Sequence, residues 1–146
     1  MQLSCVVFAL ITKRKTMATI KSYTDIEQSK KLAEILPLES ADMTYCAITE
    51  GMREKMTIKN WEVNVGLDIA IRENLFSYRN GYVFPCWSLA ALLSILDFPS
   101  LTQNKEDEWE VCVLNHKSDG YINVLADNPV DACYKLILKL HKLNLL

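Results

Sequence analysis

The sequence has 146 residues, of which 50% are hydrophobic and 23% are charged, and its formal net charge at pH 7 is −2. This length is usual for one domain, and the hydrophobic content is too high for a disordered chain. The net charge argues against nucleic-acid binding by phosphate neutralisation, because that mode needs clustered lysine and arginine. We therefore expect a folded protein whose partner is not a nucleic acid.

Residues 1–16 differ in character from the rest of the chain. The apolar stretch Leu3–Ile11 is followed by three positive charges at 13–15, whereas a secretory signal has its charges before the apolar stretch. A membrane span needs roughly 20 apolar residues, which leaves a weak interfacial anchor as an alternative. We expect a non-native or disordered extension, with Met17 as the biological start and 17–146 as a single α+β domain. Without the extension the net charge falls by three, from −2 to −5.

The first predicted element is an amphipathic helix that begins at Thr24 and ends before Pro37. Thr24 to Glu27 fits a capping box, in which two side chains accept hydrogen bonds from the free N–H groups of a helix start. Apolar residues recur after it at helical spacing, with lysine and glutamate between them. The pattern predicts a helix that covers the core.

Two strands follow this helix. Met43–Thr49 is rich in strand formers, and every second residue from Trp61 to Ile71 is apolar, which is the period of a half-buried strand. We expect the two segments to pair as an antiparallel hairpin, with a bulge or bend at Gly66. Residues 67–79 also fit a short helix, so both interpretations stand for that stretch.

The central element is the run Pro85–Leu96, which is strongly apolar and almost uncharged. The tight-turn pair Asn80-Gly81 and the short apolar segment Tyr82–Phe84 lead into it. A helix that is hydrophobic all round belongs in a protein interior, and proline suits the first turn of a helix. The sequence therefore predicts a buried central helix over about 85–96, ended by Asp97–Ser100.

The last third of the chain predicts a hairpin and a helix. Residues 102–107 are polar and predict a loop; Trp109–Leu114 and Tyr121–Leu125 then predict two strands. Asn128 and Pro129 mark a helix start. The predicted fold class is therefore α+β, an antiparallel sheet of about four to five strands with three helices on one face.

The five cysteines are odd in number, widely spaced and set in apolar runs: Cys5, Cys46, Cys86, Cys112 and Cys133. This pattern favours reduced thiols and a cytoplasmic location. Cysteine and histidine do not cluster at zinc-ligand spacing, so we expect no metal site, and no motif indicates a cofactor.

Cys86 is the candidate for catalysis. A thiol in the first turn of a helix can have a lowered pKa, and its general base would be His116 or His141. The alternative is a buried structural thiol, which the apolar surroundings in the sequence favour. A cysteine-dependent hydrolase or transferase that uses Cys86 is therefore the alternative function, and the chain is more simply explained without catalysis.

Aromatic residues provide the candidate binding sites. Trp61 and Trp109 each begin a predicted strand, where they would lie at the sheet rim, and Tyr82 follows the predicted turn. Exposed aromatic residues of this kind are enriched at protein interfaces. Trp87 lies inside the central run, and we expect it to belong to the core.

Three fragments, Ser40–Met43, Pro85–Leu92 and Asp131–Tyr134, resemble a group of short uncharacterised proteins of gut Bacteroidetes and their phages or mobile elements. The resemblance runs from about Thr19 to the end of the chain, and 47–82 matches little of it. It implies a cytoplasmic accessory protein of a phage or mobile element and supplies no activity. Together with the residues, it predicts a small cytoplasmic binding or interaction protein whose partner is a protein, with no membrane span.

Overall fold

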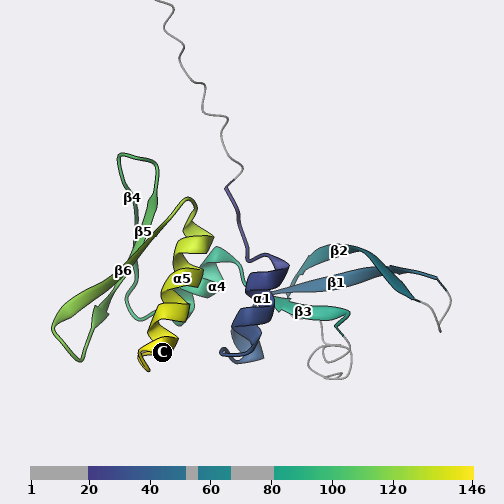
Figure 1. Ribbon diagram of the computed structural model, residues 1–146, viewed down its shortest axis with the longest axis horizontal. Helices are drawn as coiled ribbons and strands as arrows, with labels where there is room; N and C mark the ends of the chain where they lie inside the picture. Colours follow the sequence, from purple (N-terminus) through teal and green to yellow (C-terminus); the bar gives the residue numbers. More distant parts are fainter. Residues whose placement is uncertain (1–19, 52–55, 67–80) are drawn as a thin grey trace, which may run out of the picture.

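The computed structural model describes residues 20–51, 56–66 and 81–146 (Figure 1). The predictions for 1–16 and 67–79 lie outside the described residues. The elements in chain order are α1 (Ile26–Ala33), a 3-10 turn η1 (Leu38–Ser40), β1 (Met43–Glu50), β2 (Thr57–Val65), β3 (Val83–Cys86), α4 (Leu89–Ile95), β4 (Ser100–Gln103), β5 (Trp109–Asn115), β6 (Gly120–Ala126) and α5 (Pro129–Lys142).

The α+β class is confirmed, but the prediction of one sheet of four to five strands is wrong. The described strands form two three-stranded antiparallel sheets, β2-β1-β3 and β4-β5-β6, and the three helices of the described residues lie between them (Figure 1). The chain leaves the first sheet at β3 and passes through α4 before it enters β4. Because β4 pairs with β5 and not with β1, Ser100–Gln103 begins a second sheet where the sequence predicted a loop from 102 onward.

α1 begins one residue later than predicted. Asp25, not Thr24, is the N-cap: its carboxylate accepts a hydrogen bond from the Gln28 backbone N–H at 2.9 Å, and the Gln28 side chain accepts one from the Asp25 backbone N–H at 3.2 Å. The capping box is therefore present in shifted register. Thr24 is fully buried, and its hydroxyl is engaged by Ser29 and by the Trp87 backbone.

The central helix begins at Leu89, four residues after the predicted start. Pro85 and Cys86 belong to β3, where they pair with Thr44 and Met43 of β1. A proline is accepted there because β3 is at the edge of its sheet, and an edge strand does not need every N–H for pairing. The helix is also not buried all round, since Leu92 is buried and Ala90 is exposed.

Both predicted hairpins are present, but the second strand of the first hairpin begins at Thr57, four residues before the predicted start at Trp61. β1 pairs antiparallel with β2 from Met43↔Val65 to Glu50↔Thr57, with a bulge between Ile48 and Thr49. Gly66 ends β2 with a φ of 92°, a conformation that glycine adopts without strain. β5 pairs with β6 as expected.

α5 agrees with its sequence signals. The Asn128 side chain accepts a hydrogen bond from the Asp131 backbone N–H at 2.9 Å, and Pro129 is the first helical residue. One face of the helix packs on β5 and β6. None of the described helices is long and apolar enough to cross a membrane.

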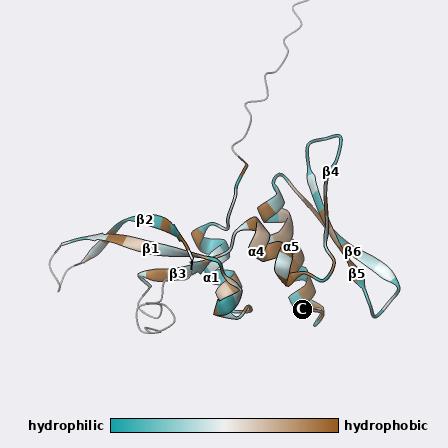
Figure 2. Cartoon of the chain, turned by 180° about the vertical axis from the view of Figure 1, so that it is seen from behind, coloured by the Kyte–Doolittle hydropathy of each residue, from teal (hydrophilic) through white to brown (hydrophobic). Residues whose placement is uncertain are grey.

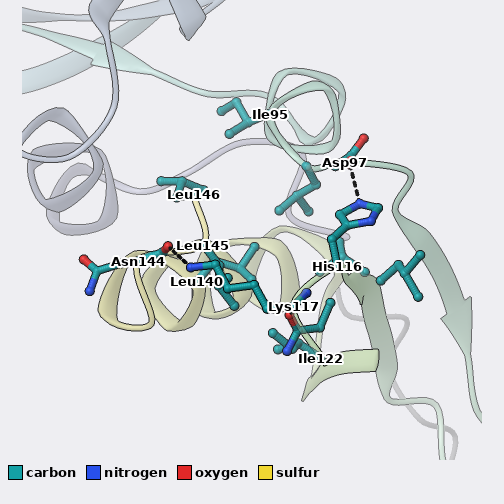
Figure 3. A pocket seen from close by; sticks show the side chains of 13 residues that line it. Ile95, Asp97, His116, Lys117, Ile122, Leu140, Asn144, Leu145 and Leu146 are labelled. Carbon is teal, nitrogen blue, oxygen red and sulfur yellow. Dashed lines mark hydrogen bonds and ion pairs between the residues drawn. The ribbon is translucent and has the colours of Figure 1, made fainter. Parts of the chain in front are cut away.

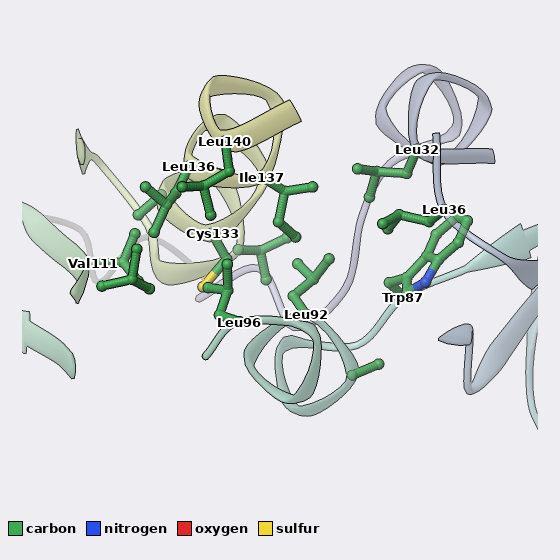
Figure 4. Close-up of a cluster of buried hydrophobic side chains, with 14 of the residues drawn as sticks. Leu32, Leu36, Trp87, Leu92, Leu96, Val111, Cys133, Leu136, Ile137 and Leu140 are labelled. Carbon is green, nitrogen blue, oxygen red and sulfur yellow. The ribbon is translucent and has the colours of Figure 1, made fainter. Parts of the chain in front are cut away.

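One cluster of buried side chains fills the space around the helices (Figure 4). Apolar residues accordingly lie on α4 and α5 in the middle of the molecule (Figure 2). Trp87 is fully buried, as predicted, and its indole N–H donates to the Ser40 hydroxyl at 2.9 Å. Most of its large aliphatic side chains come from α1, α4, β5, α5 and the residues that follow α1 and α4: Leu32, Leu36, Leu92, Leu96, Val111, Val113, Leu136, Ile137 and Leu140.

Candidate binding site: an aromatic surface on the first sheet

Trp61 and Tyr82 lie on the same face of the first sheet, on either side of Ala47. Trp61 is the β2 partner of Ala47, and the Ala47 backbone N–H donates to the Tyr82 carbonyl at 2.7 Å. Side chains directly opposite one another in antiparallel strands point to the same face of a sheet. The register therefore places two large rings beside one small side chain, and all three residues are partly exposed.

The next row on this face is also aromatic. Tyr45 lies two residues before Ala47 and pairs with Phe84 of β3. The ring centroids of Tyr45 and Trp61 are 6.4 Å apart in an edge-to-face arrangement, and those of Trp61 and Phe84 are 5.4 Å apart. Tyr23 adds a ring 6.3 Å from Tyr45. Such ring pairs each contribute about 0.5–1.5 kcal/mol beyond their buried area.

We call this set the aromatic surface: Tyr23, Tyr45, Ala47, Trp61, Tyr82 and Phe84. Tyr45 anchors it, because this side chain is buried and its hydroxyl donates to the Thr24 carbonyl at 2.8 Å. Burial raises the pKa of Tyr45 well above its ordinary value, so the phenol remains a neutral donor.

A cation already lies on the aromatic surface. The Lys30 ammonium of α1 is 5.4 Å from the centroid of the Phe84 ring, within the range of a cation–π interaction. The same ammonium is 3.3 Å from the Glu27 carboxylate. The Phe84 ring therefore already holds a positive charge over its face.

Trp109 does not belong to this surface. It lies on β5 in the second sheet, two residues before the buried Val111, and packs against the core cluster. Of the three predicted binding residues, the structure thus brings together Trp61 and Tyr82 and places Trp109 elsewhere.

Cys86 lies at the end of β3, so the predicted location in the first turn of a helix is wrong. The side chain is fully buried, with Sγ 3.7 Å from the Thr24 hydroxyl and 3.6 Å from the Thr24 carbonyl oxygen. Burial raises the pKa of the Cys86 thiol to about 11. A thiol with a raised pKa is a poor nucleophile at neutral pH.

His116 is in the turn between β5 and β6, as the sequence predicted, with its Nε2 atom 2.8 Å from a carboxylate oxygen of Asp97. It lines a pocket that does not include Cys86. Among the described residues, no hydrogen bond joins this histidine to Cys86. His141 is in the last turn of α5, where a cation complements the helix dipole.

Sequence reasoning missed Tyr23, Tyr45, Phe84 and Lys30. A signal was present, because Tyr45 and Ala47, like Tyr82 and Phe84, are two residues apart and must share a strand face. Whether these side chains come together depends on the register of three strands, and a local sequence pattern does not specify that register.

The chemistry of the aromatic surface is that of binding, since it offers apolar area and ring faces. In the part of the chain that the structure describes, no group of three or more His, Cys, Asp and Glu side chains is arranged to hold a metal ion. Comparison with protein-family models, with curated proteins and with solved structures found no match to this chain.

Proposed function

We propose that this chain is a small cytoplasmic binding protein without catalysis, and that it binds a partner protein on the aromatic surface. The observation that carries the proposal is the placement of Trp61 and Tyr82, both partly exposed, on either side of Ala47 on one sheet face. Its setting would be that of an accessory protein of a phage or mobile element, as the resemblance of the sequence implies.

A protein partner suits the composition and rigidity of this surface. Tryptophan and tyrosine are enriched among the few residues that dominate the binding energy of protein interfaces. They bury much area and lose little conformational entropy, since each has only two side-chain torsions. β1 is the central strand of its sheet, so the rings flanking Ala47 are held on a paired backbone.

The partner segment that fits best carries an arginine. Lys30 above Phe84 is an example within the chain of a cation held on these rings. A guanidinium group stacks on tryptophan and tyrosine better than an ammonium does, because it is planar and less strongly hydrated. The net charge of −2 also favours the approach of a basic segment.

Catalysis by Cys86 has less support. The thiol is buried and its pKa is raised to about 11, and the candidate base His116 hydrogen-bonds elsewhere. We therefore keep the binding function as the conclusion.

The test is affinity capture with the full chain from the organism that encodes it, followed by affinity measurements with each captured protein. Trp61→Ala should weaken the binding of the true partner by about 2 kcal/mol, which is about 30-fold in affinity, as expected for a central aromatic residue. Tyr121→Ala is the matched control, because Tyr121 is an aromatic residue of the second sheet with 74% of its surface exposed. A protein that binds all three forms equally would contradict the proposal.

Opposite charges introduced at Ala47 test whether the partner inserts an arginine. Ala47→Arg places a cation between the rings and should abolish binding, whereas Ala47→Glu places a shorter, anionic side chain there and should preserve or strengthen binding. Circular dichroism and thermal unfolding would establish that both variants are folded. Equal loss of binding in both variants would rule out a cationic guest.

A further inference from the structure

Resting on the function proposed above, we propose that the partner protein adds an extended segment to the free edge of β2, with a basic residue opposite Glu62 and an arginine beside Trp61. β2 lies at an edge of the first sheet, and in the described part of the chain β1 is the only strand that pairs with it (Figure 1). A segment added to a sheet edge gains affinity from main-chain hydrogen bonds and specificity from alternate side chains.

The backbone groups that face the free edge belong to Trp61, Val63 and Val65. Hydrogen-bonded and non-hydrogen-bonded pairs alternate along an antiparallel ladder. The Gly66 backbone N–H donates to the Asp42 carbonyl at 2.7 Å, one step beyond the last pair of the register. Counted from this bond, residues 60, 62 and 64 bond to β1, and the three residues between and after them turn their N–H and C=O groups outward.

Two further hydrogen bonds agree with this alternation. Ala47, the β1 partner of Trp61, donates its backbone N–H to the Tyr82 carbonyl at 2.7 Å, so this group faces β3 and not β2. The Trp61 backbone N–H donates at 2.9 Å to the side-chain oxygen of Asn60 in its own strand. A carbonyl of an added strand can replace that oxygen and keep the N–H satisfied.

The same three residues place their side chains on the face of the aromatic surface. Trp61 belongs to that surface, and Val63 pairs with its residue Tyr45. Val65 is next on this face and has 89% of its surface exposed. A residue of the added strand directly opposite Trp61 puts its side chain beside the indole ring. A guanidinium group stacks there, and apolar side chains at alternate positions match the two valines.

Glu62 provides the charge on the opposite face of the edge. It is exposed and forms no ion pair with any described residue, whereas Lys59, the lysine of β2, is 3.0 Å from Glu50. Opposite charges across two strands are favourable, and like charges are not. A basic segment therefore fits the edge, whereas a second copy of β2 would bring another Glu62 and a lysine that is already paired.

The experiment measures the affinity of the captured partner for edge variants of the full chain. Val63→Pro removes an outward N–H, and an edge strand accepts proline at such a position. It should weaken binding about tenfold, as the loss of one or two main-chain hydrogen bonds predicts. Val63→Thr keeps the N–H and the branched side chain and should have little effect. Circular dichroism and thermal unfolding would establish that both variants are folded.

Hydrogen exchange tests the same edge without a substitution. In the free chain, the amides of Trp61, Val63 and Val65 should exchange faster than those of Glu62 and Asn64, which bond to β1. An added strand bonds the outward amides, so the alternation should disappear in the complex. An alternation that persists in the complex would overturn the proposal.

Glu62→Gln tests the basic residue and should weaken binding about threefold, as the loss of one exposed ion pair predicts. Its control is Asp97→Asn, which removes an exposed carboxylate beside the pocket of the second sheet and should have no effect (Figure 3). Equal effects of the two variants would overturn the pairing of Glu62 with a basic residue.

Comparison with Trp61→Ala separates strand addition from the binding function. Loss of binding in Trp61→Ala but not in Val63→Pro overturns strand addition and leaves the aromatic surface as the binding site. Loss in Val63→Pro but not in Trp61→Ala supports strand addition and contradicts the proposed function, and loss in neither contradicts both. Self-association of the chain that Val63→Pro abolishes would make a second copy the occupant of the edge and overturn the proposal.

Discussion

The ammonium of Lys21 lies 2.9 Å from the carboxylate of Asp131, and this ion pair joins the segment before α1 to the first turn of α5. The same ammonium is 2.8 Å from Asp25 and 2.6 Å from the Gln28 side chain. Gln28 also donates to Asp131 at 2.6 Å. The starts of two helices far apart in sequence are thus joined by one polar cluster.

The Lys21 cluster predicts a dependence of stability on pH. Burial alone would raise the pKa of Asp131, but hydrogen bonds from Gln28, Lys21 and Asn128 outweigh it and hold the pKa below its ordinary value. Asp25 behaves alike: burial opposes the shift, and the hydrogen bond from Lys21 outweighs it to lower the pKa. A carboxylate with a lowered pKa stabilises the fold above its unfolded pKa of about 3.9, and this stabilisation is lost as the pH falls through the folded value.

Lys21→Met should lower the free energy of unfolding at pH 7 by about 1 kcal/mol, the upper range for a partly exposed pair. The variant should also lose less stability than the parent between pH 5 and pH 3, because its carboxylates titrate closer to their ordinary pKa. Denaturant unfolding at several pH values measures both effects. Lys31→Met, which removes an exposed pair with Glu34, is the control, and an identical pH profile for the two variants would contradict the prediction.

Thiol labelling distinguishes the buried cysteines from the accessible ones. Cys86 and Cys133 are fully buried, with pKa values that burial raises to about 11 and about 12, whereas Cys46 and Cys112 are partly exposed. Iodoacetamide should therefore modify the latter two first in the native protein. Mass spectrometry of the peptides provides the measurement. Early modification of Cys86 would contradict the prediction and support the alternative function of a cysteine-dependent enzyme.

Thr24→Val removes a buried hydroxyl that holds two elements together. Thr24 Oγ1 accepts a hydrogen bond from the Trp87 backbone N–H at 3.1 Å and lies 2.7 Å from the Ser29 hydroxyl. The variant leaves a buried N–H without its partner, so the free energy of unfolding should fall by about 1–3 kcal/mol. Thr24→Ser retains the hydroxyl and should cost less. Equal losses in the two variants would show that the methyl group contributes as much as the hydrogen bonds do, and no loss in Thr24→Val would contradict the prediction.

Ser88→Ala tests the start of α4. The Ser88 hydroxyl accepts a hydrogen bond from the Ala91 backbone N–H at 3.1 Å and donates to the Asp42 carboxylate. Its removal should lower the free energy of unfolding by about 1 kcal/mol, as for other N-caps. A double-mutant cycle with Asp42→Ala should show coupling, since the two side chains act through one hydrogen bond. Additive losses would mean that Asp42 stabilises α4 only through the Ser88 backbone.

The starts of α4 and α5 show where sequence reasoning succeeds and where it fails. Asn128 and Pro129 were correctly identified as the start of α5, because a cap and a first-turn proline act within a few residues. Pro85 has the same local meaning, yet it lies in β3, because its pairing with Thr44 outweighs the local preference. Such pairing joins residues about forty positions apart and leaves no short-range pattern.

The candidate site was likewise predicted only in part from the sequence. Residue type identified Trp61 and Tyr82 as partly exposed aromatic residues, but Trp61 lies in the middle of β2 and not at the strand start that the sequence predicted. Their placement on either side of Ala47 follows from the register of β1 with two neighbours, which hydrophobic periodicity does not specify. Trp109 has a similar sequence context, and only its position on the core side of β5 separates it from the others.

The core cluster takes its residues from the helices, the segments beside them and the second sheet, so among the described residues no side chain of β1, β2 or β3 belongs to it. The first sheet depends instead on the ring contacts of the aromatic surface and on its docking against α1. Regions with few buried apolar contacts open at lower free energy than the global unfolding. In native-state hydrogen exchange, the first sheet should therefore open as a separate unit before α5 and β5, and a partner bound there would slow its exchange without changing that of the second sheet.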